Sequence, residues 1–277
     1  MGEKMNHEMD LQAIAEEIKA AQDHCSKIVP LTSRFRDFSN AEAYAVAKII
    51  HEMRLKEGAI PVGRKIGFTN PEMWSIYGVR EPIWGYLYDS TVVKPAGSTF
   101  RCRIGRFAEP KIEPEIVVHF GSSPPENAGI ENVLASIDWI AHGIEIVQSH
   151  FPGWKFQAAD TIADWGLHAT LIVGEPVGVN LLGAEVVADL ENFTVTLSCD
   201  GDVREQGKGS NALGNPLKAI IHLIDVLAKQ PNVSRLQSGE LVTTGTLTAA
   251  LPILPGQRWA TNFNGMAMPG ISVLFEK

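Results

Sequence analysis

The 277-residue sequence predicts an α+β fold, in which a helical N-terminal region precedes a mixed, β-rich core. Helical periodicity dominates up to Gly58, and from about Ile60 short β-branched runs alternate with glycine and proline. Few helical segments separate those runs, so a regularly alternating βαβ sheet is not expected. We place a boundary near residue 75, which gives a helical region over residues 1–75 and a β-rich core over residues 76–277.

Two helices are predicted in the N-terminal region. Apolar side chains recur at helical spacing between Leu11 and Ala21 and define the first helix. In the second, Ser39 and Glu42 are spaced as a capping box, an apolar stripe follows, and Gly58 ends the helix. These signals make the N-terminal region a helical cap on the core.

Turn residues divide the rest of the chain into short elements. Asp200 and Gly201, between two apolar runs, indicate a hairpin. Two further helices are expected over residues 131–140 and 215–228, and Asn215 caps the second. Strands are expected at 61–68, 85–88, 115–120, 143–147, 169–173, 193–198, 240–246, 258–263 and 271–275.

Composition narrows the classes of function. The formal net charge of −8 argues against a nucleic-acid surface, which needs a stripe of lysine and arginine. No apolar run approaches the roughly 20 residues of a membrane span. The charged N-terminus has no apolar stretch behind it, so a signal peptide is not expected. Three widely separated cysteines indicate reduced thiols, and we expect a cytoplasmic protein.

A pair of acidic residues gives the clearest sign of chemistry. Glu113 and Glu115 lie two residues apart at the start of an apolar strand, so their carboxylates point to the same face. Like charges that close repel, and a cation between them removes the conflict. The alternative is that both are exposed charges at a strand edge, paired with Lys111 or an arginine.

A third acid, Glu145, lies inside the strand-like run 143–147 and also needs a partner. Three carboxylates without cysteine or histidine at ligand spacing favour a hard, oxygen-preferring ion, for which Mg²⁺ or Mn²⁺ is suitable. We therefore predict Glu113, Glu115 and Glu145 as metal ligands. An alternating strand that turns Glu145 outward is the competing interpretation.

Other polar residues are candidates for binding or proton transfer. Lys65 stands in a short strand between glycines, and a buried lysine there suits proton transfer, although a surface strand lysine fits the pattern too. The loop after the Glu145 strand contains Lys155, Asp160 and Asp164, for which an ordinary loop with helix-capping aspartates is the alternative. Thr248 ends a threonine-rich turn that offers donors to an anion, or is simply a strand residue.

Taken together, these residues resemble the fumarylacetoacetate hydrolase superfamily, and within it the branch of 2-oxopent-4-enoate hydratases and 4-oxalocrotonate decarboxylases. The resemblance runs from about Ala41 to Phe275. Its pieces, short but specific in order and spacing, are Ala43-Tyr44, Gly63-Arg64-Lys65-Ile66-Gly67-Phe68-Thr69, Gly85-Tyr86-Leu87, Glu113-x-Glu115, Glu145-Ile146-Val147, Asp160-Thr161-Ile162-Ala163-Asp164, Thr244-Gly245-Thr246-Leu247-Thr248-Ala249 and Leu254-Pro255-Gly256.

The resemblance implies a β-roll core and usually a homo-oligomer. It implies that the three glutamates bind Mg²⁺ or Mn²⁺, that Lys65 and Asp164 are catalytic, and that Thr248 helps to hold the substrate carboxylate, with Lys155 and Asp160 as further candidates. Two positions depart from the branch. Gln148-Ser149-His150 stands where Asp-Ser-Arg is usual, and Trp165 stands where asparagine is usual.

The implied function is a lyase of aromatic-compound catabolism that hydrates a 2-hydroxy-2,4-dienoate. Decarboxylation of a 2-oxo-3-hexenedioate is an alternative, and Arg64, Lys155 or His150 would then contact the second carboxylate. Hydrolysis of a carbon–carbon bond in an acylpyruvate is a second alternative, which needs His24 or His51 in the site. All three functions require a small 2-oxo acid as the partner.

Overall fold

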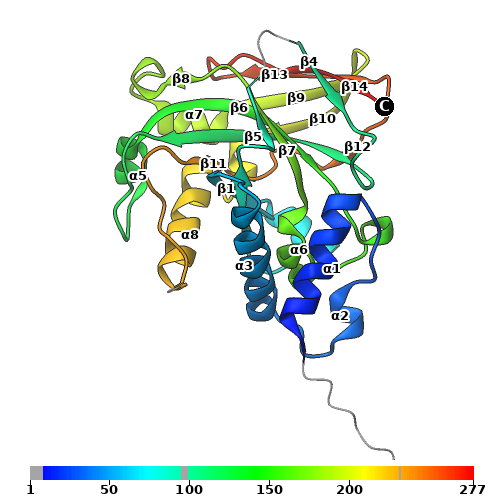
Figure 1. Cartoon of the computed structure of the whole chain (residues 1–277). Coiled ribbons are helices and arrows are strands. Elements are labelled where there is room, and N and C mark those ends of the chain that lie inside the picture. Colours follow the sequence, from blue (N-terminus) through cyan, green and yellow to red (C-terminus); the bar gives the residue numbers. More distant parts are fainter. Residues whose placement is uncertain (1–8, 95–98, 231) are drawn as a thin grey trace, which may run out of the picture.

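Two β-sheets form the centre of the computed structural model, which describes residues 9–94, 99–230 and 232–277 (Figure 1). The large sheet has the order β2-β1-β11-β5-β6-β7-β3, with β12 beside β5 and β8 beside β6. Its strands are β1 (Pro61–Gly67), β2 (Ile83–Tyr88), β3 (Val92–Val93), β5 (Lys111–Phe120), β6 (Ile137–Val147), β7 (His168–Val173), β8 (Val177–Gly178), β11 (Leu241–Thr243) and β12 (Leu251–Pro252).

The small sheet packs on one face of the large one. Its order is β10-β9-β13-β14-β4, from β4 (Thr99–Arg103), β9 (Thr194–Cys199), β10 (Asp202–Lys208), β13 (Arg258–Asn264) and β14 (Ser272–Glu276). Ile144 and Ile146 of β6 meet Leu197 and Phe275 of the small sheet in one buried cluster. This mixed, helix-covered arrangement is the α+β fold that the sequence predicted, and residues 200–201 form the expected hairpin turn with positive φ at both positions.

Helices cover the other parts of the sheets. They are α1 (Leu11–His24), α2 (Leu31–Arg34), α3 (Asn40–Lys56), α4 (Trp74–Tyr77), α5 (Ile130–Ser136), α6 (Ala158–Ala163), α7 (Val186–Asn192) and α8 (Pro216–Ala228), with short 3₁₀ segments η1 (Pro71–Met73), η2 (Pro152–Trp154), η3 (Trp165–Leu167), η4 (Val179–Leu181) and η5 (Gly209–Asn211). The helices α1, α2, α3 and α6 gather below the sheets, and α8 stands beside α3 (Figure 1). None of the described helices has the length and apolar character to cross a membrane.

The caps that the sequence predicted are present. Ser39 and Glu42 form the capping box of α3, and the Asn215 side chain accepts a hydrogen bond from Leu217 N at the start of α8. The helix expected over 131–140 was too long, because α5 ends at Ser136 and the chain enters β6 at Ile137. Pairing of residues 137–140 with β5 and β8 outweighs the local helical pattern.

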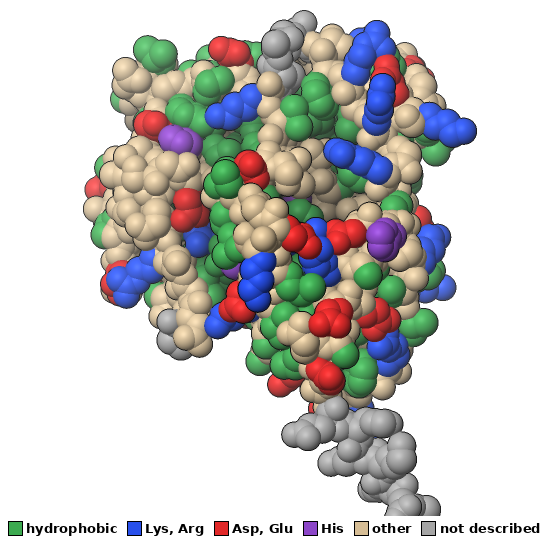
Figure 2. Space-filling model, viewed as in Figure 1, with side chains coloured by type: hydrophobic (Ala, Val, Ile, Leu, Met, Phe, Trp, Pro, Cys, Tyr) green, Lys and Arg blue, Asp and Glu red, His purple; other side chains and the backbone are tan. Residues whose placement is uncertain are grey.

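Strand β1 lies within the predicted helical region but belongs to the large sheet. It pairs in parallel with β11 and antiparallel with β2. The division near residue 75 stays a prediction. On the face shown in Figure 2, acidic and basic side chains are intermingled without a continuous basic stripe.

Candidate active site

Two neighbouring strands bring the three predicted glutamates together. Glu113 on β5 and Glu145 on β6 are direct cross-strand partners, and Glu115 lies two residues further along the same face. One carboxylate oxygen from each of the three residues lies within 4.8 Å of the others. Glu115 and Glu145 are buried and Glu113 is half-buried, so the strand-edge interpretation does not hold for the cluster.

The electrostatics of this cluster suit a divalent cation. Burial, reinforced by the charge of Glu145, raises the pKa of Glu113 to about 7 and the pKa of Glu115 well above its usual value. The Glu115 carboxylate also accepts a hydrogen bond of 3.0 Å from Gly245 N. The donor atoms are carboxylate oxygens alone, which are the ligands that hard divalent ions prefer. These residues therefore fit a divalent metal.

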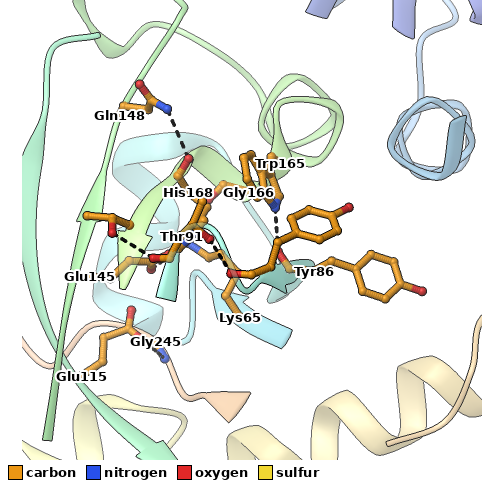
Figure 3. A network of polar contacts seen from close by, with 12 residues as sticks. Lys65, Tyr86, Thr91, Glu115, Glu145, Gln148, Trp165, Gly166, His168 and Gly245 are labelled. Atoms are coloured by element: carbon orange, nitrogen blue, oxygen red, sulfur yellow. Dashed lines mark hydrogen bonds and ion pairs between the residues drawn. The ribbon is translucent and has the colours of Figure 1, made fainter. Parts of the chain in front are cut away.

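Glu145 is held from two sides (Figure 3). Its Oε2 accepts a hydrogen bond of 2.9 Å from Lys65 Nζ, and its Oε1 lies 2.6 Å from His168 Nδ1. Burial alone would raise the pKa of Glu145, but Lys65 and His168 outweigh it and hold the pKa well below its usual value. The other ring nitrogen of His168 lies 2.9 Å from Thr91 Oγ1, so the imidazole is fixed at both ends.

Lys65 is buried between the glutamates and a backbone carbonyl. Its side chain is 3% exposed, so it is not a surface lysine, and Nζ donates 2.9 Å hydrogen bonds to Glu145 and to Gly166 O. Burial acts to lower the pKa of Lys65, but the charges of the three glutamates outweigh it and the pKa is raised. Gly85 lies opposite Lys65 in the register of β2, where a larger residue would press on Trp165.

A cavity opens beside the lysine and the glutamates. It is lined by two of the glutamates, by Lys65, and by side chains and backbone that are mostly apolar. The lining residues are Lys65, Gly67, Phe68, Asn70, Ile83, Glu113, Glu115, Val147, Trp154, Phe156, Gly166, Leu167, Thr246 and Ala250. A substrate in this cavity would meet the carboxylate cluster at one end and apolar walls elsewhere.

The remaining predicted residues lie outside this lining. The Asp164 carboxylate is buried 2.8 Å from His150 Nδ1 and accepts a hydrogen bond of 3.2 Å from Gln22, at the start of the turn that carries Gly166. Asp160 accepts hydrogen bonds from Thr32 and from Gln157 N, so it caps α6 and ties α2 to it.

Lys155 and Thr248 also lie outside the lining of this cavity. Lys155 is exposed and lines a shallow surface depression with Lys27. Thr248 is buried, and its hydroxyl donates a hydrogen bond of 3.1 Å to Ala249 O, whereas Thr246 from the same turn reaches the cavity lining. Roles for Asp160, Asp164, Lys155 and Thr248 in binding or catalysis therefore stay predictions.

Sequence reasoning missed His168 and Gly166. His168 is buried at the start of the apolar run that forms β7, and a histidine leading such a run was the available signal. Gly166 acts through its backbone carbonyl, for which the sequence carries no signal. Both lie in the chain segment that follows α6.

Comparisons with known proteins find relatives over almost the whole chain. The chain is 30% identical to a 4-oxalocrotonate decarboxylase of Pseudomonas putida, covering 96% of this chain and 97% of the relative. It is also 30% identical to 2-keto-4-pentenoate hydratase 2 of Dechloromonas aromatica (strain RCB), covering 98% and 99%. Both names denote lyases, so the predicted enzyme class, a lyase of the hydratase and decarboxylase branch, is confirmed.

Solved structures show the same fold and a divalent metal. The 4-oxalocrotonate decarboxylase from Pseudomonas putida G7, complexed with magnesium and adipate, superposes with a TM-score of 0.86 at 28% identity, covering 96% of this chain and 97% of that one. A fumarylpyruvate hydrolase from Pseudomonas aeruginosa with Mn²⁺ and pyruvate has a TM-score of 0.61 at 16% identity, covering 77% and 88%, and shows the fold alone. The family model for the fumarylacetoacetate (FAA) hydrolase C-terminal domain matches residues 72–266, and the chain belongs to this family.

Proposed function

We propose that this chain is a Mg²⁺-dependent hydratase that adds water to a 2-hydroxy-2,4-dienoate, the enol form of a 2-oxo-4-enoate. The observation that carries the proposal is the meeting of three carboxylates and the Lys65 ammonium at one end of a cavity with mostly apolar walls. Carboxylate oxygens suit Mg²⁺, with Mn²⁺ as the alternative. A divalent cation held there supplies Lewis-acid chemistry to a bound 2-oxo acid.

The residues of the chain supply the proton chemistry and the orientation. Lys65 Nζ, with its raised pKa, carries a proton at neutral pH and lies next to the carboxylates, so we assign it to proton transfer on the substrate's enol system. Phe68, Ile83 and Leu167 orient the hydrocarbon end of the substrate and exclude bulk water. In the net reaction the enol hydroxyl gives up its proton and becomes the 2-oxo group, while the terminal carbon, C5, gains a proton. Water then adds across C3 and C4, with its hydroxyl on C4 and its proton on C3.

The charge of the cavity favours hydration over decarboxylation. A 2-oxo-3-hexenedioate carries a second carboxylate, which needs its own cation. Arg64 is paired with Glu240 at 2.7 Å, Lys155 is exposed elsewhere, and His150 is paired with Asp164. Among the described residues that line the cavity, Lys65 is the single cationic side chain.

Decarboxylation remains the second candidate, because a similar solved structure is a decarboxylase that holds adipate, itself a dicarboxylate. Hydrolysis of an acylpyruvate has less support. The His51 ring stacks on Tyr86, and its Nδ1 is hydrogen-bonded to the Tyr88 hydroxyl. Neither His24 nor His51 is among the residues that line the catalytic cavity.

One experiment tests the proposal. The purified protein is assayed with 2-hydroxypenta-2,4-dienoate and with 2-oxo-3-hexenedioate, before and after removal of divalent metal with EDTA. We expect water addition to the first substrate, its loss with EDTA and its recovery with Mg²⁺. Hydration that is indifferent to EDTA, or carbon dioxide release from the second substrate at a higher kcat/KM, would contradict it. The same preparation tests the expected homo-oligomer by light scattering.

A further inference from the structure

A second and larger cavity lies behind the active site. It has a volume of about 500 Å³, which is in the range of small-molecule pockets. Its walls come from α3, from β2, from the end of α6 with Trp165, and from the segment after α8. Its lining shares no residue with that of the catalytic cavity. Nothing in the proposed hydration uses this space.

Aromatic rings dominate one wall of this cavity. Three of them, Trp84, Tyr86 and Tyr88, alternate along β2, while Tyr44 faces them from α3 and Trp165 comes from the turn after α6. Tyr44 stacks on Trp84 with a centroid distance of 5.7 Å, and Tyr88 tilts against Trp165 at 5.2 Å. Tyr44, Tyr86 and Trp165 keep part of their surface exposed. Such walls favour a flat aromatic ring by offset or edge-to-face contact.

The charges around the cavity have one sign. Lys48 on α3, Arg54 on α3 and Lys229 after α8 belong to the lining, and no acidic residue is among its described members. Asp23 already pairs with Arg54 at 2.5 Å, and Lys48 lies 3.9 Å from the exposed Glu52. The exposed Lys48 and Lys229 therefore offer positive charge to an anionic group.

We propose that this aromatic cavity, formed by α3, β2, Trp165 and the segment after α8, binds a planar aromatic carboxylate at a site separate from the glutamate cluster. The ring lies among the tyrosine and tryptophan side chains, and the carboxylate faces Lys48 and Lys229. The two cavities lie back to back. Along β2, Ile83 lines the catalytic cavity and Trp84 lines the aromatic one. In the turn after α6, Gly166 lines the catalytic cavity and Trp165 lines the aromatic one.

The probe for this site is 2-naphthoate, titrated calorimetrically into the full-length protein saturated with Mg²⁺ and oxalate, so that the catalytic cavity is blocked. We expect one site per chain, and about tenfold weaker binding of the neutral 2-naphthamide because it lacks the charge that faces the lysines. Absence of binding under these conditions, or equal affinity for the amide, would overturn the proposal.

Variants locate the site. Ala47 lines the cavity on α3, so Ala47→Trp should fill it and abolish binding, whereas Ala20→Trp, at an exposed helical position outside the lining, should bind normally. Lys48→Gln with Lys229→Gln, both at exposed positions, should weaken 2-naphthoate by about tenfold and leave hydratase kinetics unchanged.

Two outcomes would refute this placement. One is undiminished binding in both the filled and the charge-neutral variants. The other is a cavity buried between copies, in which case Ala47→Trp reduces the mass of the assembly in light scattering and the wild type does not bind 2-naphthoate. If Ala47→Trp does not fold, the lysine variant decides alone.

Discussion

Without a metal ion, burial and the charge of Glu145 act against ionisation of Glu113 and Glu115 in the candidate active site, and Lys65 offsets this only in part. Because Glu115 has a raised pKa in the folded chain, the folded metal-free protein binds a proton that the unfolded chain releases above its ordinary pKa of 4.5. Stability of the metal-free protein is therefore lost as pH rises from that value through the folded pKa. A bound divalent metal replaces the proton and reverses this loss.

Replacing Glu115 with glutamine separates these two effects. At about pH 8, we expect Glu115→Gln to stabilise the metal-free protein by about 1–3 kcal/mol, because a neutral amide removes the buried repulsion. The same change should abolish the rise in Tm that Mg²⁺ gives the wild type. Thermal unfolding with EDTA and with Mg²⁺ measures both. Glu131→Gln, at an exposed position on α5, is the control, and a destabilised metal-free Glu115→Gln protein would contradict the argument.

His168 is a positioning residue for Glu145. Its Nδ1 lies 2.6 Å from Glu145 Oε1, while Thr91 fixes the far side of the ring. We expect His168→Ala to weaken Mn²⁺ binding by roughly tenfold to a hundredfold, as loss of a group that orients a metal ligand does elsewhere. His168→Asn, whose amide can donate from the position of Nδ1, should recover most of the affinity. Equal calorimetric affinity in all three proteins would show that Glu145 needs no such support.

At the residue scale the sequence predicted the three glutamates of the cluster but not the residues that hold them in place. Glu113 and Glu115 were found because strand geometry places residues two apart on one face. The cross-strand register that puts Glu145 opposite Glu113 depends on pairing between distant segments, which the sequence does not state. For the same reason the contact of His168 with Glu145 was not foreseen.

At the scale of elements, the turn η3 connects the helical region to Lys65, to which we assign proton transfer. Trp165, Gly166 and Leu167 all have positive φ, which is costly for the two larger residues. Within the turn, Leu167 N donates a hydrogen bond of 2.9 Å to Asp164 O, and Trp165 Nε1 donates one of 2.6 Å to Tyr86 O. This backbone conformation places Gly166 O where it accepts a hydrogen bond from Lys65 Nζ.

Two glycines test this role. Gly166 has a φ of +59° and a Cβ there would lie 3.4 Å from Lys65 Cδ, whereas Gly153 has a φ of +66° and open space around it. Both Gly→Ala changes should cost about 1 kcal/mol of stability from the left-handed backbone. Only Gly166→Ala should also lower kcat, by about tenfold, because relief of the strained backbone moves Gly166 O, which accepts a hydrogen bond from Lys65 Nζ. Equal kcat in the two variants would remove the turn from the mechanism.

The elements themselves were predicted unevenly. Capping signals located α3 and α8 well, since caps are local features of a few residues. The short helix α6 was missed, and β10 was expected only as the second arm of the hairpin at residues 200–201. Asp160 caps α6 through Gln157 N and also binds Thr32 of the distant α2, and β10 pairs along the edge of β9. Tertiary pairing, not local pattern, decides such segments.

For the molecule as a whole, His142 joins the two sheets. It lies on β6 in the large sheet, where Nδ1 donates to Glu115 O at 3.0 Å, and its Nε2 lies 2.9 Å from Thr261 Oγ1 on β13 of the small sheet. Burial lowers the pKa of His142 to about 4, although the bond to the Glu115 carbonyl acts in the opposite direction. The imidazole is therefore neutral in the folded protein at physiological pH.

This histidine should make the stability of the whole fold depend on acid. The unfolded chain binds a proton at His142 near the ordinary pKa of 6.5, and the folded chain binds it only near 4. The contribution of the neutral imidazole to the free energy of unfolding is therefore complete above about pH 6.5 and is lost as the pH falls toward 4. The shift corresponds to about 3 kcal/mol. Metal-free His142→Gln cannot take up this proton, so its unfolding free energy should fall by about 3 kcal/mol less than that of the wild type between about pH 7 and pH 4. Urea unfolding at a series of pH values measures the difference, and His24→Gln, at an exposed position, is the control. Parallel pH profiles for the wild type and His142→Gln would show that the junction of the sheets does not depend on a neutral imidazole.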